Sequence, residues 1–416
     1  MIAALMLTLL ALSIPAAAFA EGFGVYEWSA AGTAMGDNYM FGENDPAVLA
    51  YNPAQITKLN GSYLSLGTSW VNAATSVSFK NGPLNITNSD EWDNSYSPAI
   101  IPYMYYAQKA GKNSWWGVAF FARYGNQIEY DDLWPGRFDT VFTGVKGVTL
   151  QPTYAFKIND KLSAAVGLDI NYIQLRMKKD VPTGLTTSIR SDIDGDSTNI
   201  GWVASLMYDF TPKTSAAVVY RARVKHTMDA DANFNGSVQG LGPYRLSTQA
   251  HGTVTLPDSL SLGLGHKFND RTRMEINATW TNWSTYNALN LSFDDPVLGN
   301  KTSDNPKDWS AAWRIGIGIE HKLSQKWSIL GGYVYDESPV PDEWMDFTVP
   351  TGDRHRGSIG FKYRPNETSE LAFAYTAIWA GNRDVRSHIG GADYASAYIH
   401  DGLTQVLSIG YTVKLK

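Results

Sequence analysis

The chain contains fourteen stretches of alternating apolar and polar residues, and the gaps between these stretches are alternately short and long. Lys109–Asn113 and Ile158–Lys161 are short gaps, whereas Asp180–Gly195 and Ala230–Gln249 are long ones. Antiparallel strands with tight turns at one end and long loops at the other are typical of outer-membrane β-barrels. The sequence therefore predicts an all-β fold, a 14-stranded antiparallel transmembrane β-barrel.

The residues of Trp309–His321 show how one predicted strand divides its two faces. Alternate positions carry tryptophan, alanine or isoleucine, and the positions between them carry small or charged residues such as Arg314. Because successive side chains on a strand point to opposite faces, one face is apolar and the other is polar or small. A soluble β-sandwich also alternates, but the predicted strands exceed the usual length of roughly five or six residues. Tryptophan and tyrosine also recur near strand ends, as in membrane-interface girdles.

The N-terminal part of the chain does not follow the strand pattern. Residues 1–20 carry no charge and end in small residues at Ala18 and Ala20, which predicts a secretory signal peptide rather than a transmembrane helix. Residues 21–60 contain many glycines and short helical possibilities at Ala30–Met35 and Pro46–Leu49. We expect residues 21–60 to form a plug inside the barrel and residues 61–416 to form the fourteen strands.

Composition excludes several classes of function. Charged residues make up 18% of the chain, less than the quarter expected of an average soluble protein, and the net charge of −6 argues against a nucleic-acid partner. The chain contains no cysteine, so disulfides and thiolate chemistry are absent. No phosphate-cradling glycine loop is present, and we expect no cofactor and no metal.

The fifth predicted strand changes character along its length. Its inner face begins with polar and small residues and continues with Ile173, Leu175 and Met177, while its outer face ends in Arg176 and Lys178. We expect an apolar inner wall near the extracellular loops, with the two cations facing lipid headgroups. The alternative is a β-bulge that reverses the register of the strand.

The seventh predicted strand carries a column of cations. If Val218, Tyr220 and their alternate neighbours face lipid, then Arg221, Arg223 and Lys225 face the lumen. Three inward cations could bind a carboxylate, for which arginine can supply two hydrogen bonds. The alternative is an internal ladder of ion pairs to inward acids such as Glu275, Glu320 or Asp169.

Several local sequences resemble the FadL/TodX family of outer-membrane transporters for long-chain fatty acids and aromatic hydrocarbons. The resemblance covers the mature chain, and Asn52-Pro53-Ala54 looks like the family's N-terminal hatch motif. The other matching segments are Ile128–Arg137, Tyr220–His226, Leu256-Pro257, Trp280–Ser284 and Tyr335–Pro341.

The resemblance implies a monomeric barrel closed by the hatch and embedded in the bacterial outer membrane, in contact with its lipid and lipopolysaccharide. It implies capture of a hydrophobic molecule by extracellular loops, transfer to an upper-barrel site, and lateral exit at a kinked third strand. Gly125 is the expected bend, because glycine inside a strand often marks one.

Three alternatives to fatty-acid uptake remain at this point. The same fold could import neutral aromatic hydrocarbons or alkanes, which need no cation in the site. An outer-membrane enzyme would need a nucleophile with a base, but the seven histidines are scattered and no serine motif stands out. A polar porin would keep a polar channel and conduct ions.

Overall fold

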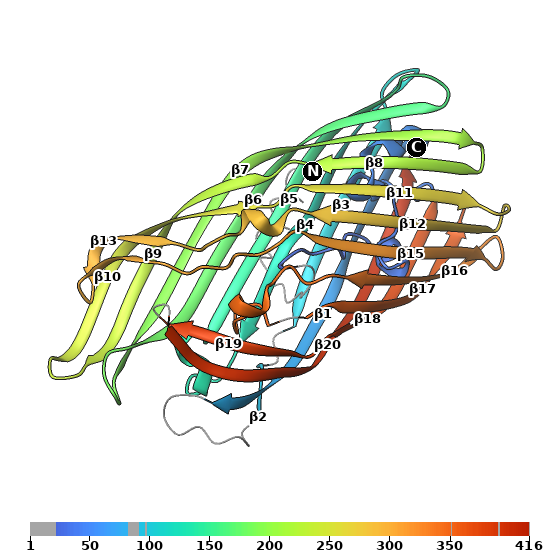
Figure 1. The fold of residues 1–416 in the computed structure, drawn as a ribbon. Coiled ribbons are helices and arrows are strands. Elements are labelled where there is room, and N and C mark those ends of the chain that lie inside the picture. Colours follow the sequence, from blue (N-terminus) through green and yellow to red (C-terminus); the bar gives the residue numbers. More distant parts are fainter. Residues whose placement is uncertain (1–21, 82–90, 96–97, 351, 390–391, 416) are drawn as a thin grey trace.

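The computed structural model describes residues 22–81, 91–95, 98–350, 352–389 and 392–415, so the expected signal peptide lies outside the described residues. The strands form one closed antiparallel sheet, because β1 pairs with β3 on one side and with β20 on the other. The sheet forms the wall of a barrel (Figure 1). We call each barrel strand, counted across any interruption, a stave; the barrel has fourteen staves because several of them are divided into two strands. The predicted fold class is confirmed.

The first seven staves comprise β1 (Ser62–Asn81), the short β2 (Glu91–Asp93) with β3 (Ala99–Lys109), β4 (Ser114–Glu129), β5 (Phe142–Lys157), β6 (Leu162–Pro182), β7 (Ser188–Thr211), and the divided stave β8 (Thr214–Arg221) with β9 (Val224–Val238). The remaining staves comprise β10 (Gly242–Leu256) with β11 (Ser259–Lys267), β12 (Thr272–Thr281) with β13 (Leu291–Val297), β14 (Asn300–Ser303) with β15 (Ala312–Lys322), β16 (Trp327–Asp336), β17 (Arg354–Asn366), β18 (Ser369–Ala380) with β19 (Arg383–Ile389), and β20 (Ala392–Leu415).

Two of the expected long loops are mostly strand. β6 and β7 remain paired as far as Pro182 and Ser188, so the loop expected over Asp180–Gly195 shrinks to a short turn. β9 and β10 likewise pair as far as Val238 and Gly242. Both hairpins continue well above the apolar part of the barrel, where neither face of a strand contacts lipid. Their residues are therefore largely polar and do not show the alternation from which the strands were predicted.

The alternation of faces in β15 follows the prediction. Trp313, Ile315 and Ile317 are exposed on the outer surface, whereas Arg314 is 5% exposed and points inward. Outer apolar side chains in a barrel face lipid rather than water. Within the described residues, no helix is long and apolar enough to cross a membrane.

The N-terminal segment fills the interior of the barrel. It contains two short α-helices, α2 (Ala30–Ala34) and α3 (Val48–Tyr51), and the 3₁₀ helix η1 (Pro53–Lys58). α2 contacts β16, β17, β18 and β20, whereas η1 contacts β4 to β7, so the segment bridges opposite parts of the wall. Figure 1 shows these blue turns inside the ring of strands.

Small inward residues make room for this segment. A Cβ atom on Gly332 of β16 would lie 2.1 Å from the carbonyl carbon of Met35, and one on Gly360 of β17 would lie 2.5 Å from the Cβ of Ala34. Real Cβ atoms essentially never approach so closely, which means that the backbone of the segment occupies the space that larger side chains would need. Glycines on the inner face of β16 and β17 therefore leave room for the N-terminal segment.

Candidate functional site: an apolar cavity beside an opening in the wall

The third stave, β4, leaves the sheet partway along its length. β3 and β4 pair only between Met104↔Phe120 and Lys109↔Trp115, although β3 continues to pair with β1 as far as Ala99. All ten residues of β4 from Ala119 to Ile128 are buried, in place of alternate burial. The upper half of β4 has therefore turned into the lumen, which leaves an interruption in the wall between β3 and β4.

The register shift of β4 against β5 falls between Phe121 and Tyr124. Gly125 lies just beyond this bulge and pairs regularly with Lys146. The kink in the third stave is present, but a β-bulge rather than Gly125 produces it, because the extra residue itself bends the strand. The bulge therefore lies before Gly125, the position at which the sequence predicts the bend.

The N-terminal segment takes the place of β3 along the kinked part of β4. The amide of Gly125 donates to the carbonyl of Phe23 (2.9 Å), and the amide of Val25 donates to the carbonyl of Arg123 (2.8 Å). The indole Nε1 of Trp28 donates to the carbonyl of Ala122 (2.8 Å). These bonds satisfy backbone groups that the kink removes from the sheet, so residues 23–28 close the opening from inside.

An apolar cavity of about 40 Å³ lies above Phe23. Ile173, Leu175 and Met177 of β6 line it, so the apolar inner wall lies where the sequence placed it and the alternative of a reversed register is excluded there. Several other staves and loops, far apart in sequence, complete the lining: Asn126, Thr143, Val145, Met228, Val254, Tyr286, Leu289, Asn305, Lys307, Thr348 and Val349. A cavity of this size has room for a few water molecules but not for an acyl chain.

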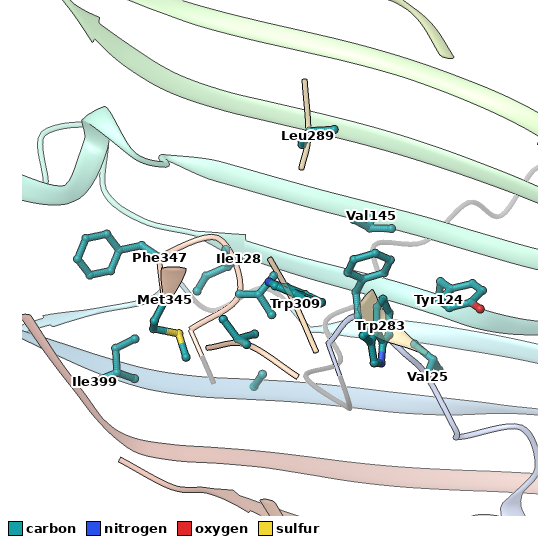
Figure 2. Close-up of a cluster of buried hydrophobic side chains, with 14 of the residues drawn as sticks. Val25, Tyr124, Ile128, Val145, Trp283, Leu289, Trp309, Met345, Phe347 and Ile399 are labelled. Atoms are coloured by element: carbon teal, nitrogen blue, oxygen red, sulfur yellow. The ribbon is translucent and has the colours of Figure 1, made fainter. Parts of the chain in front are cut away.

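An aromatic cage holds Phe23 beneath the cavity. The ring of Phe23 lies 4.6 Å from Trp283, 5.4 Å from Tyr286 and 5.7 Å from Trp309, measured between centroids. Figure 2 shows Trp283 and Trp309 beside Val25 and Tyr124 in this cluster of buried side chains. Edge-to-face contacts of this kind contribute roughly 0.5–1.5 kcal/mol each beyond burial. Nothing in the sequence indicates that Phe23 joins these rings, because the three partners lie more than 250 positions away.

Lys307 brings a positive charge to the cavity. Its ammonium is ion-paired with Asp346, and both groups are largely buried. Burial alone would lower the pKa of Lys307, but Asp346 holds that pKa above its ordinary value. Asp139 lies in the same group, where burial and the nearby Asp346 raise its pKa to about 6. No pattern in the sequence marks Lys307 as a residue of the cavity, because it lies in an irregular segment between β14 and β15.

The loop between β16 and β17, which contains the 3₁₀ helix η4 (Asp342–Trp344), folds over the cavity. Met345 and Phe347 are fully buried in the apolar cluster (Figure 2). The amide of Phe347 donates to Oδ2 of Asp139 (2.9 Å), and Nδ2 of Asn126 donates to the carbonyl of Thr348 (3.0 Å). The loop is thereby fastened both to the cavity and to the kinked strand β4.

Only one of the three cations predicted for the lumen lies there. Arg221 is 4% exposed and donates to Asp169 (3.2 Å), to Oε1 of Gln151 (2.7 Å) and to the carbonyl of Ala50 (2.6 Å). It therefore follows the ion-pair alternative and fastens the N-terminal segment to the wall. The inward placement of Arg223 and Lys225 is wrong, because both are exposed on the outer face.

The reason for this error is an interruption between β8 and β9. Val224, predicted to face lipid, is 2% exposed and packs inside with His226 and Met228. Two residues without regular pairing, at positions 222 and 223, shift the alternation by one position, so Val224 and Lys225 of β9 lie opposite to their predicted faces. A one-residue shift has this effect because the side-chain period of a strand is two.

Asn52, Pro53 and Ala54 form the junction between α3 and η1. Asn52 is fully buried and its Nδ2 donates to the carbonyl of Met40 (3.1 Å), while the amide of Ala54 donates to Oγ of Ser205 on β7 (2.8 Å). Pro53 begins η1, where its missing amide hydrogen is not needed. This tripeptide thus joins two parts of the N-terminal segment to each other and to the barrel wall.

One group of side chains has the residue types of a metal site. Ligand atoms of Glu91, His400 and Asp401 lie within 4.8 Å of one another near the extracellular edge. Both ring nitrogens of His400 already have partners, Oγ of Ser78 (2.8 Å) and Oδ2 of Asp401 (2.7 Å). These hydrogen bonds account for the cluster without an ion.

The fold and the cavity define a class of protein: a transmembrane β-barrel whose interior is occluded and whose wall is interrupted beside an apolar chamber. The family model for "Outer membrane protein transport protein (OMPP1/FadL/TodX)" matches residues 11–414. The chain therefore belongs to this family and is a protein of the bacterial outer membrane.

Individual relatives are distant in sequence. A "Long-chain fatty acid transport protein" of Escherichia coli is 23% identical, with 85% of this chain and 86% of that protein covered. "Outer membrane protein P1" of Haemophilus influenzae is 24% identical over 80% of both chains. The crystal structure of a Pseudomonas aeruginosa FadL homologue gives a TM-score of 0.85 at 20% identity, with 95% and 100% coverage. That of the Pseudomonas putida toluene transporter TodX gives 0.71 at 16% identity, with 95% and 99% coverage.

Proposed function

We propose that this protein carries long-chain fatty acids passively across the outer membrane. The observation that carries the proposal is the apolar cavity with Lys307 at its edge and the interruption between β3 and β4 beside it. A fatty acid has an apolar chain and one carboxylate, which match an apolar wall and a single cation. Relatives named as long-chain fatty acid transport proteins support the same assignment.

The route follows from the arrangement of the site. A fatty acid captured among the extracellular loops enters the cavity, displaces Phe23 and residues 24–28, and leaves sideways between β3 and β4 into the lipid. Moving between apolar surroundings avoids exposing methylenes to water, which would cost about 0.8 kcal/mol for each one. In this proposal residues 21–60 act as the hatch, residues 61–416 form the wall, and a single copy of the chain suffices.

The hatch motif has a defined part in this route. Ala54 bonds the hatch to Ser205 of the wall, and Asn52 bonds to Met40 within the hatch, which keeps the lumen closed to ions while the residues near Phe23 move. Deleting the tripeptide should raise ion conductance in a planar bilayer. Conductance and uptake equal to those of the parent protein would contradict this role.

Lys307 replaces Arg221, Arg223 and Lys225 as the carboxylate-binding residue of the proposal. The test compares Lys307→Met with Lys301→Met, a control that removes an exposed lysine of β14 outside the cavity. We expect the first variant to lose about tenfold or more in oleate affinity, because a charge-assisted hydrogen bond contributes roughly 1.5–3 kcal/mol. The control should bind oleate as the parent does, measured by calorimetry in detergent. Unchanged oleate binding by Lys307→Met would overturn the carboxylate assignment.

Import of neutral aromatic hydrocarbons or alkanes is the second candidate. Asp346 already balances the charge of Lys307, and most of the remaining lining is apolar, so a neutral cargo also fits. One solved structure of similar fold is that of the Pseudomonas putida toluene transporter TodX. Uptake of a neutral alkane that is equal in the parent and in Lys307→Met, together with no oleate binding by either, would favour this candidate.

A further inference from the structure

The interruption between β8 and β9 turns two cations toward the outside of the barrel. Below it Arg221 points inward, and above it Val224 and His226 point inward, so Arg223 and Lys225 lie on the outer face. The side chain of Arg223 is 57% exposed. These cations are therefore separate from the cargo cavity and can bind a molecule on the outer surface of the barrel.

Both cations lie at the upper edge of the apolar outer surface. The stretch Ile200–Phe210 of β7 carries alternate exposed apolar side chains, and its eleven residues match the roughly 9–11 that cross a bilayer core. The amide of Ala222 donates to the carbonyl of Trp202 (2.9 Å), and Nδ2 of Asn199 donates to the carbonyl of Lys225 (2.7 Å). Lys225 therefore lies at the same height along the barrel as Asn199, the residue that directly precedes this apolar stretch.

An aromatic pair marks the same boundary. The rings of Trp202 and Tyr220 lie 5.2 Å apart on the outer face, directly below Arg223. Tryptophan and tyrosine gather where the hydrocarbon meets the headgroups. Arg223 and Lys225 therefore stand at the level of the headgroup phosphates of the outer leaflet.

The charges of these two residues are only partly balanced by the protein. Arg223 lies 3.2 Å from Asp258, but this carboxylate also accepts hydrogen bonds from Tyr220 (3.2 Å) and Asn282 (3.2 Å). Within the described residues the ammonium of Lys225 has no ion-pair partner. By contrast, Arg176 on β6 is held by two hydrogen bonds to Asp192, of 3.1 and 2.9 Å.

Three threonines lie beside and above Lys225 on the outer face. Lys225 pairs with Thr255 across the β9–β10 ladder, and Thr227 pairs with Thr253 one step higher on the same face. Thr227 and Thr253 are exposed, and Thr255 is half-buried. Hydroxyl and ammonium groups both donate hydrogen bonds, which phosphate oxygens accept.

An acidic band lies directly above this group. Asp196 is the direct cross-strand partner of Asp229, and Asp194 is that of Asp231. His251 lies between Asp229 (2.7 Å) and Asp294 (3.1 Å). Because like charges repel, this band disfavours an anion at its own level and confines an anionic group to the level of the cations below.

We propose that Arg223 and Lys225, with the hydroxyls of Thr227, Thr253 and Thr255, bind the phosphate of an outer-leaflet lipid on the outer wall of the barrel. The acyl chains of this lipid lie against the apolar surface of β7 and β8, below Trp202 and Tyr220. The site is independent of the cargo and of the route through β3 and β4.

The test uses the full chain in detergent with a phosphorylated glycolipid and its dephosphorylated form, measured by native mass spectrometry. The double variant Arg223→Gln/Lys225→Gln should retain the phosphorylated lipid roughly 30-fold less well, about fivefold for each cation near an anionic surface. The control Arg245→Gln/Lys301→Gln removes the same charge from exposed outer positions on β10 and β14 and should bind as the parent does.

Three results would overturn the site: unchanged retention by the double variant, equal loss in the control, or equal retention of the dephosphorylated lipid. Displacement of the lipid by an equal concentration of inorganic phosphate would overturn its assignment to a lipid. A difference in electrophoretic mobility between unheated and boiled samples establishes that each variant is folded. Oleate binding should stay at the parent level in the double variant, so failure of this site and failure of the proposed transport are distinguishable.

Discussion

Arg221 and Arg223 are two positions apart on one predicted strand, yet only the replacement of Arg221 by glutamine should loosen the N-terminal segment. Simple alternation gives both side chains the same face, whereas the structure buries Arg221 in the interior and exposes Arg223 outside. The pair therefore tests the register shift and the fastening of the N-terminal segment in one experiment.

The magnitude for Arg221→Gln follows from its contacts. The change removes the ion pair with Asp169 and leaves the carbonyl of Ala50 without its 2.6 Å donor. Breaking a buried ion pair costs roughly 3–5 kcal/mol, and Arg123, 3.0 Å from Asp169, retains part of that interaction. We therefore expect the docking of the N-terminal segment to weaken by about 3 kcal/mol, roughly a hundredfold in its equilibrium.

Hydrogen exchange of residues 48–58 in the folded barrel measures this docking directly. Exchange in Arg221→Gln should accelerate by about two orders of magnitude, and planar-bilayer conductance should rise. Arg223→Gln should match the parent in both measurements. Unchanged exchange in Arg221→Gln, or equal acceleration in both variants, would refute the assignment of the two faces.

Three further predictions concern the interior and its closure. Gly332→Ala places a methyl group against the backbone of Met35 and should destabilise the docking of the N-terminal segment by roughly 1–3 kcal/mol. In the control Gly331→Ala, the added methyl group would lie 3.7 Å from its nearest neighbour, and hydrogen exchange should equal that of the parent protein. Similar hydrogen exchange in both variants would contradict the packing of Gly332 against Met35. Phe23→Ala empties the aromatic cage at a cost of about 3–5 kcal/mol and should speed oleate uptake into vesicles, and slower uptake by a folded variant would argue against Phe23 as the closure. Burial raises the pKa of Asp139 from 3.8 to about 6, so its contribution to docking of the loops is fully present below pH 4 and is lost as the pH rises through 6. The fluorescence of Trp134 should follow this change in the parent protein and stay constant over the same pH range in Asp139→Asn. Equal pH profiles in the two proteins would exclude Asp139 as the cause.

The sequence was sufficient for the features that depend on local alternation. The faces of β15, the inward Ile173, Leu175 and Met177, and the helical turns near Ala30 and Val48 all follow from side-chain period and composition. The fourteen staves could be counted because each stretch of alternation ends in residues that favour turns. These features need no information about which distant segments meet.

The sequence was insufficient wherever one residue shifts the register. The bulge at Phe121–Tyr124 and the interruption before Val224 each reverse the relation between position and face, and neither contains a residue type that identifies it. A bulge depends on how two neighbouring strands fit together, not on the composition of either one. Gly125 was the most visible candidate for a bend, but it lies outside the shift.

By itself, then, the sequence determined a fourteen-stave barrel with an apolar outer surface, because alternation is repeated along many strands. It also predicted a plug from the segment without alternation and an apolar upper wall from the inner face of one strand. Only the tertiary structure decided that Phe23 bonds to β4 and packs against Trp283. It also decided that Lys307 rather than Arg223 or Lys225 lines the cavity, and that the latter two face outward. These outcomes depend on single contacts between segments hundreds of residues apart and on one-residue shifts, for which a periodic pattern carries no information.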